Sequence, residues 1–287
     1  MNNPKVIFVT GVTGNQGGAV ARNLINKGFK VRALTRNPTS AQAQNLRKQQ
    51  VDIIEGDLNE QKTFSHHLKN IDGIFSVQTF ENGIDKEIKQ GINLANLAKE
   101  YNVPHFLYSS VVGADLQTGI PHFESKLKIE AHIKQLRLPY TILRPASFYE
   151  NFLIPQVRSR LVNGKLVSPV DRNIVQQFIS TEDIGRISTQ IFINPGQYEG
   201  RTITMAAEQL DLVQVSGIFS KVLEKEIRYQ KLPGLITRFA MGKDLYKMFK
   251  WINENGGVFI KDIGAFQKEF PDYLTLKEWI KINFKMT

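Results

Sequence analysis

The residues with the clearest chemical purpose form a glycine-rich turn. The segment Thr10-Gly11-Val12-Thr13-Gly14-Asn15-Gln16-Gly17-Gly18 follows a short apolar run and precedes a stretch of helical period. Its GxxGxxG spacing is typical of a turn that binds a pyrophosphate: Gly11 makes the bend, Gly14 lets the backbone approach the phosphates, and Gly17 lets the helix pack on the strand. A glycine turn can also be a plain connection. The strand before it and the helix after it favour dinucleotide binding.

The second predicted strand is followed by a basic residue, Arg36, at the place where NAD-binding proteins have an acidic residue. That acid holds the ribose hydroxyls, about 20 residues after the glycines. Here the segment Thr35-Arg36-Asn37-Pro38 has no acid, and the Arg36 guanidinium can pair with a 2′-phosphate and stack on adenine. A solvated basic loop is the alternative. We predict that the chain prefers NADP(H) over NAD(H). Asp57, after the third strand, fits the adenine amine and equally a helix N-cap.

The charge distribution supports a phosphorylated ligand. The chain carries 37 Lys and Arg against 27 Asp and Glu, a net charge of +10. Its first 50 residues hold eight bases and no acid, and the first acid is Asp52. Most of the excess positive charge therefore lies in the part of the sequence that contains the glycine turn and Arg36. The sequence has no helix-turn-helix pattern, zinc module or aromatic-interleaved basic stripe, so we expect no nucleic acid as a partner.

Several other chemistries are excluded or not expected. Because the chain has no cysteine, it has no disulfide, no thiolate catalysis and no Cys-ligated zinc. The five histidines form no HExxH motif, so we expect no metal centre. No apolar run approaches the roughly 18 residues of a transmembrane helix, and the start of the chain lacks a secretory pattern. We predict a cytoplasmic location without a membrane partner.

The chain alternates short β-branched runs with stretches of helical period, which predicts βα units on a parallel sheet. We expect strands at 5–10, 30–35, 52–55, 73–77, 105–109, 140–143 and 176–179, and helices at 42–50, 60–69, 84–101, 121–135 and 184–192. This is an α/β fold: a Rossmann doubly wound parallel sheet with a smaller C-terminal α/β lobe. The dinucleotide-binding domain is predicted at 1–155, with 176–194 returning to it. The smaller lobe comprises 156–175 and 195–287.

Several segments resemble one family. Val9–Gly18, Val31–Pro38, Gly56-Asp57-Leu58 and Phe148-Tyr149-Glu150-Asn151-Phe152 resemble the NmrA-like branch of the atypical short-chain dehydrogenases/reductases. Glu87-Ile88-Lys89-Gln90-Gly91, His122-Phe123-Glu124-Ser125-Lys126 and Leu274-Thr275-Leu276-Lys277-Glu278-Trp279 are similar to its NADPH-sensing members. The resemblance spans nearly the whole chain. It is dense through residue 155 and thin from 205 to 270, where a substrate pocket would be shaped.

The resemblance implies a Rossmann domain, a smaller lobe, and NADP(H) in the cleft between them. By position, it assigns the pyrophosphate to Gly11, Thr13, Gly14, Asn15, Gln16 and Gly17, and the 2′-phosphate to Arg36 and Asn37. It places Asp57 and Leu58 beside adenine and Gln78, Thr79 and Phe80 beside the ribose. It brings Lys126 to the nicotinamide ribose, with Phe148, Tyr149 and Asn151 at the nicotinamide end.

The catalytic pair of typical short-chain reductases is altered. Those enzymes use a Tyr and a Lys four residues apart, where the Lys lowers the phenol pKa and the phenol protonates the carbonyl oxygen. Here His122 stands at the Tyr position and Lys126 keeps the Lys. His122 is either a general acid or a polar first-turn residue, and Lys126 binds the cofactor or pairs with Glu130.

Three other hydroxyls have two interpretations each. Ser109 and Ser110, at the end of the fifth predicted strand, either hydrogen-bond a substrate carbonyl or form a strand-to-loop turn. Tyr149 is either a second phenol near the nicotinamide or a packing residue.

Two functions from different classes follow. We predict an NADPH-dependent reductase of quinone-like or small carbonyl acceptors, since the hydride comes from the cofactor and a quinone needs little acid catalysis. The alternative is a non-catalytic NADPH/NADP redox sensor that regulates a partner protein. Whether the chain is an enzyme stays open because the usual Tyr is missing. We expect a monomer or homodimer.

Overall fold

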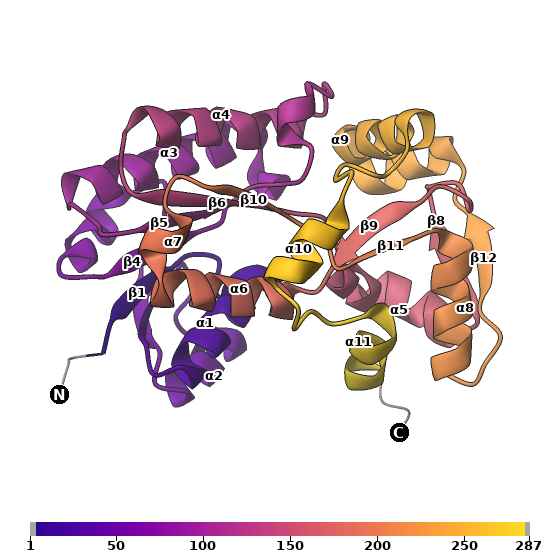
Figure 1. Cartoon of the computed structure of the whole chain (residues 1–287), viewed down its shortest axis with the longest axis horizontal. Helices are drawn as coiled ribbons and strands as arrows, with labels where there is room; N and C mark the ends of the chain where they lie inside the picture. Colours follow the sequence, from indigo (N-terminus) through magenta and orange to yellow (C-terminus); the bar gives the residue numbers. More distant parts are fainter. Residues whose placement is uncertain (1–3, 285–287) are drawn as a thin grey trace. The chain divides into compact units, whose positions relative to one another are not determined.

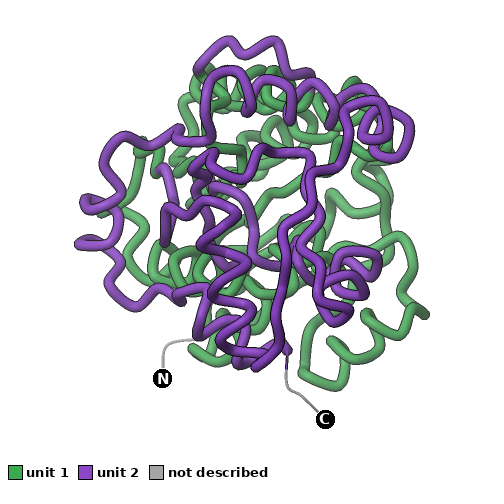
Figure 2. Tube along the Cα trace, turned by 90° about the vertical axis from the view of Figure 1, so that its right-hand side faces the viewer, with its two compact units in different colours: residues 1–115, 122–144, 181–203 green, residues 116–121, 145–180, 204–287 purple. Residues whose placement is uncertain are grey.

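The computed structural model describes residues 4–284, which fall into two compact units (Figures 1 and 2). Unit 1 contains residues up to 115 together with 122–144 and 181–203. Unit 2 contains 116–121, 145–180 and the residues from 204 onward. Each unit is described by itself below.

The main sheet has seven strands in the order β10-β6-β5-β4-β1-β2-β3. The strands are β1 (Val6–Val9), β2 (Lys30–Thr35), β3 (Asp52–Glu55), β4 (Gly73–Ser76), β5 (Phe106–Ser109), β6 (Tyr140–Pro145) and β10 (Thr202–Met205). The pairs β1–β2, β2–β3, β1–β4, β4–β5 and β5–β6 are all parallel. The order reverses at β1, which makes the carboxyl ends of β1 and β4 the switch point where such sheets bind ligands. The predicted Rossmann fold is confirmed.

Helices cover both faces of this sheet. They are α1 (Asn15–Asn26), α2 (Ala41–Lys48), α3 (Ile84–Glu100), α4 (Pro121–Gln135), α6 (Thr181–Ile193) and α7 (Pro195–Tyr198), with short 3₁₀ turns η1 (Gln61–Thr63), η2 (Ser65–Leu68), η3 (Phe80–Asn82) and η4 (Ala114–Leu116). Figure 1 shows α3 and α4 on one face and α1, α2 and α6 on the other. On the first face, strand residues such as Phe8 and Phe106 pack against Leu94 of α3 and Ile129 of α4 in a buried cluster.

One expected element is wrong. Residues 60–69 do not form an exposed helix but the two 3₁₀ turns η1 and η2. Phe64, between the two turns, and Leu68, at the end of η2, are buried, and the Phe64 ring stacks on Phe8 at 5.9 Å. A 3₁₀ turn rises further per residue than an α-helix, so this short connection can reach the core and still lead into β4. The other residues of the segment are mostly polar, so the sequence pattern did not indicate that Phe64 and Leu68 are buried.

Unit 2 has two small sheets, β11-β9-β7 and β12-β8. Its strands are β7 (Ser147–Phe148), β8 (Lys165–Ser168), β9 (Gln176–Ile179), β11 (Glu208–Leu210) and β12 (Arg228–Lys231), and its helices are η5 (Tyr149–Leu153), α5 (Pro155–Val162), α8 (Leu212–Val222), α9 (Gly234–Asn255), α10 (Ile263–Glu269) and α11 (Leu276–Asn283). An aromatic core that includes Tyr149, Phe152, Phe219 and Trp279 joins these elements. Among residues 4–284, no helix is both long and apolar enough to cross a membrane.

Candidate functional site

The glycine turn is fixed to the end of β4 by Thr10. The Thr10 amide donates to the carbonyl of Phe75 at 3.0 Å, and its hydroxyl donates to the carbonyl of Val77 at 3.0 Å. Gly11 then adopts a φ of +62°, a conformation that L side chains rarely adopt. The chain therefore turns sharply at the switch point of the sheet, as the spacing predicted.

The other two glycines of the motif are needed to different degrees. A Cβ on Gly17 would lie 2.4 Å from the carbonyl oxygen of Gly11, so α1 packs directly against the turn. A Cβ on Gly14 would lie 3.3 Å from the same oxygen, which leaves nearly enough room within the protein. Gly14 is exposed, and the bare backbone there leaves space for an external group.

The N-terminus of α1 is suited to an anion. Its N-cap residue Gly14 provides no side-chain cap, and its first turn contains no acid. The first-turn amides and the helix dipole therefore present positive partial charge beside the exposed Thr13 and Asn15. These features fit a pyrophosphate.

Arg36 follows β2 at this same edge of the sheet. Val9 of β1 lies opposite Ala33 of β2, so β2 ends just beyond the start of the glycine turn. The Arg36 side chain is exposed. Asn37 shapes the loop, because its Oδ1 accepts from the amide and the hydroxyl of Thr39 at 3.1 and 2.8 Å. The loop thus presents the guanidinium to solvent at the carboxyl edge.

Asp57 does not form the expected helix N-cap, and its contact with adenine stays a prediction. Its Oδ1 accepts from the backbone amide of Asn59 at 2.8 Å and from the Asn59 side-chain amide at 2.7 Å. The N-cap position of η1 belongs to Glu60. Asp57 therefore stabilises a local turn after β3, and the neighbouring Leu58 packs half-buried against the core.

The three residues after β4 differ in exposure. Gln78 is buried; its Nε2 donates to Ser76 Oγ at 2.9 Å, whereas its Oε1 has no hydrogen-bond partner among the described residues. Thr79 is exposed and caps η3. The Phe80 ring stacks on His122 at 4.5 Å. An unpaired buried acceptor is costly, so Gln78 offers a ready partner to a ligand donor.

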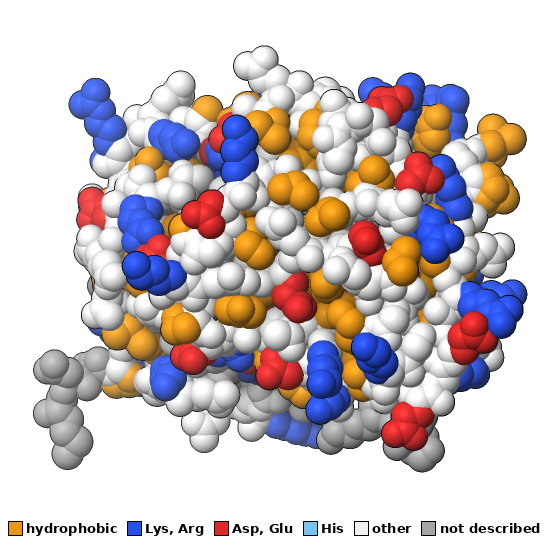
Figure 3. Space-filling model, turned by 45° about the vertical axis from the view of Figure 1, so that its right-hand side comes forward, with side chains coloured by type: hydrophobic (Ala, Val, Ile, Leu, Met, Phe, Trp, Pro, Cys, Tyr) orange, Lys and Arg blue, Asp and Glu red, His pale blue; other side chains and the backbone are white. Residues whose placement is uncertain are grey.

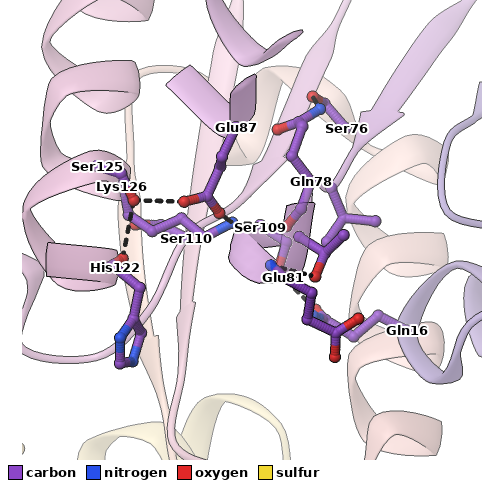
Figure 4. A network of polar contacts seen from close by, with 12 residues as sticks. Gln16, Ser76, Gln78, Glu81, Glu87, Ser109, Ser110, His122, Ser125 and Lys126 are labelled. Carbon is purple, nitrogen blue, oxygen red and sulfur yellow. Dashed lines mark hydrogen bonds and ion pairs between the residues drawn. The ribbon is translucent and has the colours of Figure 1, made fainter. Parts of the chain in front are cut away.

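The Lys126 ammonium is held by two internal acceptors (Figure 4). Its Nζ lies 2.8 Å from the Glu87 carboxylate on α3 and donates to the carbonyl of Gln78 at 2.9 Å. Ser125 also donates to Glu87. The pairing of Lys126 with Glu130 does not occur, because Glu130 accepts instead from Arg144 at 2.9 and 2.6 Å.

His122 lies in the first turn of α4 and is buried. Besides the stack on Phe80, its ring meets Phe123 edge-on at 4.9 Å. In Figure 4 the imidazole points away from the Glu87 carboxylate. Its surroundings are thus aromatic on two sides, with Phe80 stacked on the ring and Phe123 edge-on to it.

Tyr108 is the phenol beside the lysine. Lys126 Nζ lies 5.7 Å from the centroid of its ring. The side chain is completely buried, and burial raises the pKa of its hydroxyl well above the usual value, as do the charges of Glu87 and Glu130. Tyr108 therefore holds its proton more tightly than a free phenol does, whereas a Lys lowers the pKa of the Tyr in typical short-chain reductases.

Both candidate serines have acceptors inside unit 1. The hydroxyl of Ser109 donates to Gln16 Oε1 at 2.6 Å, which links the end of β5 to α1. The hydroxyl of Ser110 donates to Glu130 at 2.5 Å. Ser110 thus belongs to the buried Glu130–Arg144 network, whereas Ser109 holds a residue of the glycine turn.

The expected residues of the nicotinamide end lie in unit 2. Asn151 is exposed and Phe148 is half-buried. Tyr149 is completely buried, and its hydroxyl donates to Glu208 at 2.6 Å. Its ring also stacks on Phe178 at 6.0 Å. Tyr149 therefore anchors the core of unit 2.

The sequence did not predict that the buried carboxylate of Glu87 and the phenol of Tyr108 lie beside Lys126. Neither is near Lys126 in the chain, and only the packing of α3, α4 and β5 brings them together.

No group of three or more His, Asp or Glu side chains within residues 4–284 is placed to hold a metal. On the face in Figure 3, basic and acidic side chains are interspersed.

Comparisons with known proteins identify the family and the fold. Residues 3–280 match the NmrA-like family. A Dictyostelium discoideum NmrA-like family domain-containing protein is 29% identical, over 98% of this chain and 99% of its own length. The NADPH-dependent quinone oxidoreductase of Escherichia coli, solved with NADPH, is 22% identical with a TM-score of 0.80, over 97% of this chain and 100% of that one.

A regulatory protein shares the same fold. The negative transcriptional regulator NmrA has been solved with NADP and with NAD, with TM-scores of 0.78 and 0.79 to this chain. It is 21% identical, over 97% of this chain and 94% of its own. The match of one family model to nearly the whole chain establishes the relationship, and the chain belongs to the NmrA-like family.

Proposed function

We propose that the chain binds NADP(H) at the glycine turn of unit 1 and uses NADPH to reduce quinone-like or small carbonyl acceptors. The observation that carries the proposal is the turn itself, in which the exposed backbone at Gly14 meets an uncapped, acid-free helix terminus at the sheet edge where Arg36 follows β2. Positive helix ends and a guanidinium together suit a dinucleotide that bears an extra phosphate.

In this proposal each of the predicted residues has one role. The pyrophosphate is held by Gly11, Thr13, Gly14, Asn15, Gln16 and Gly17, and the 2′-phosphate by Arg36 and Asn37. Adenine lies between Asp57 and Leu58, and the adjoining ribose contacts Gln78, Thr79 and Phe80. The nicotinamide ribose contacts Lys126, and the nicotinamide end is lined by Phe148, Tyr149 and Asn151. Tyr149 acts as the buried support of this last group, since its hydroxyl is bound to Glu208.

When bound, NADPH supplies the hydride, and the protein holds the cofactor and the acceptor in position. Hydride transfer to a quinone gives a stabilised oxyanion that solvent can protonate, so the reaction does not need the missing Tyr. Tyr108 is completely buried and its pKa is raised, which makes it a poor proton donor, and we assign the role of candidate acid to His122. The family relationship and the NADPH-bound quinone oxidoreductase of similar fold support this choice of acceptor.

The reductase is tested by following NADPH absorbance with a panel of quinones and small aldehydes. We expect turnover with at least one quinone and its loss in Lys126→Ala. Tight NADPH binding without oxidation by any acceptor would contradict the reductase.

A redox sensor is the second candidate, and the Lys126 environment favours it. The ammonium is already paired with Glu87, and the neighbouring phenol holds its proton, so unit 1 contains no Tyr–Lys acid. Such a site can bind the cofactor without turning it over, as the fold of the regulator NmrA allows. A sensor should change its scattering profile or capture a partner only with one redox form of the cofactor. Identical profiles with NADPH, NADP and neither would contradict it.

A further inference from the structure

The buried carboxylate of Glu87 has a specific placement on α3. It lies in the first turn of the helix, where the positive helix end stabilises negative charge. The side chain is 0% exposed, and two donors of α4 converge on it, the Ser125 hydroxyl and the Lys126 ammonium. A buried charge persists only when it is paired in this way.

Close helix packing brings the two partners together. A Cβ on Gly91 would lie 2.7 Å from Ile129 Cδ1, so α3 and α4 touch at this point. Gly91 is one turn after Glu87, and Ile129 is one turn after Ser125. The glycine therefore sets the separation at which Glu87 reaches α4.

The ammonium keeps an N–H group for a ligand. Of the three N–H groups of Lys126 Nζ, one donates to the Gln78 carbonyl, and the Glu87 carboxylate lies 2.8 Å from the same nitrogen as its ion-pair partner. The Tyr108 ring lies below it at 5.7 Å. The ammonium therefore has a fixed position and a fixed direction, which an unpaired lysine with four rotatable bonds would lack.

The geometry points to Glu87 as the positioning residue of the cofactor site: it holds the Lys126 ammonium in place so that the remaining N–H meets the nicotinamide ribose. This inference rests on the proposed function, because the ribose is the ligand in question. Glu87 touches neither cofactor nor acceptor and acts through Lys126. Its second partner, Ser125, provides the matched control.

The first test needs no cofactor. A small amine-reactive reagent is applied to the intact protein, and modification of Lys126 is quantified by mass spectrometry. Glu87→Gln should label about tenfold faster than wild type, because the ammonium is no longer held. Ser125→Ala, which removes the other donor to Glu87, should label at the wild-type rate. Equal acceleration in both variants would show that Glu87 only joins the helices and would overturn the inference.

The second test is a double-mutant cycle on NADPH binding. Glu87→Gln should weaken binding about fivefold, and Glu87→Asp should restore part of the loss. Lys126→Met should weaken binding as well, and Glu87→Gln in that background should change nothing further. An additive loss in the double variant would overturn the inference, because Glu87 would then act without Lys126.

These tests separate the two proposals. If wild type does not bind NADPH, the proposed function fails, while the labelling experiment still decides whether Glu87 positions Lys126. If Glu87→Gln does not fold, the Glu87→Gln/Lys126→Met variant removes both buried charges and should fold. It should then bind NADPH as Lys126→Met does, and weaker binding would count against the inference.

Discussion

Gly17 and Gly11 approach so closely that a Cβ on Gly17 would lie 2.4 Å from the carbonyl oxygen and 2.5 Å from the carbonyl carbon of Gly11. Both obstacles are backbone atoms of a turn that hydrogen bonds fix to β4. No side-chain rotation can relieve this conflict. The third glycine of the motif is thus required by the fold itself, before any ligand is considered.

The first prediction separates the structural glycine from the ligand-binding one. Gly17→Ala should lower the thermal unfolding midpoint and abolish NADPH binding, because the turn cannot accept the methyl group. Gly14→Ala should keep the wild-type midpoint within a few degrees, because its Cβ needs only a small adjustment at 3.3 Å from Gly11. It should nevertheless weaken NADPH binding about tenfold or more by occupying the pyrophosphate space. Calorimetric titration and circular dichroism measure both effects; wild-type affinity in Gly14→Ala would contradict this position for the pyrophosphate.

The second prediction concerns the choice of cofactor. Arg36→Ala should weaken NADPH binding by roughly tenfold to a hundredfold and leave NADH binding within about twofold, since only NADPH carries the 2′-phosphate. Lys30→Ala is the matched control, because it removes the same charge at the opposite end of β2. Fluorescence titration of both cofactors gives the ratios. Equal losses in the two variants would show a general effect of charge.

The fold was predictable where short-range pattern and burial coincide. The strand expected at 176–179 is confirmed at Gln176–Ile179, and the helix expected at 121–135 begins at Pro121 as predicted. Such elements carry their periodicity in consecutive residues. The segment 60–69 failed because its course depends on Phe64 and Leu68 reaching a core built by distant strands. Tertiary packing there overrides the local preference.

The candidate site also has one part that the sequence predicts and one part that it does not. The glycine turn is contiguous, so its glycines and their strand and helix flanks could be recognised together. The pairing of Glu87 with Lys126 joins two helices far apart in the chain, and the local alternative at Glu130 was taken by Arg144. A spacing rule finds partners within one helix only. Buried pairs between helices require the packing itself.

The third prediction tests the contact that brings α3 to α4. Gly91→Ala should destabilise the protein by about 1–3 kcal/mol, because its methyl group would meet Ile129 Cδ1 and Cγ2 at 2.7 and 2.9 Å. The better helix propensity of alanine offsets up to about 1 kcal/mol of this cost. Adding Ile129→Val removes Cδ1 and should recover part of the loss. Denaturant unfolding measures the series, and a double variant no better than Gly91→Ala would contradict the contact.

The last prediction is a pH dependence from one buried histidine. His105 is 1% exposed, and burial lowers its pKa from 6.5 to about 4. Its Nε2 lies 3.0 Å from Thr141 Oγ1. Because the Thr141 hydroxyl donates to the carbonyl of Tyr198, its oxygen accepts from the His105 ring, and the lowered pKa keeps that ring neutral at pH 7. As pH falls below 6.5, the unfolded chain takes up a proton on this residue that the folded protein refuses until about pH 4. The free energy of unfolding therefore decreases through this window, by at most about 3 kcal/mol from His105.

His105→Gln keeps a donor for Thr141 and cannot titrate. Carboxylates also titrate in the same window, so the quantity to measure is the difference between wild type and variant in urea unfolding at several pH values. The variant should be less stable than wild type or equal to it at pH 7, and it should lose less stability between pH 6.5 and 4. The pKa of His105 is lower in the folded protein than in the unfolded chain. The stability of the variant relative to wild type must therefore increase as pH falls, and this increase must stop below about pH 4. A constant difference across this range would contradict the buried neutral histidine.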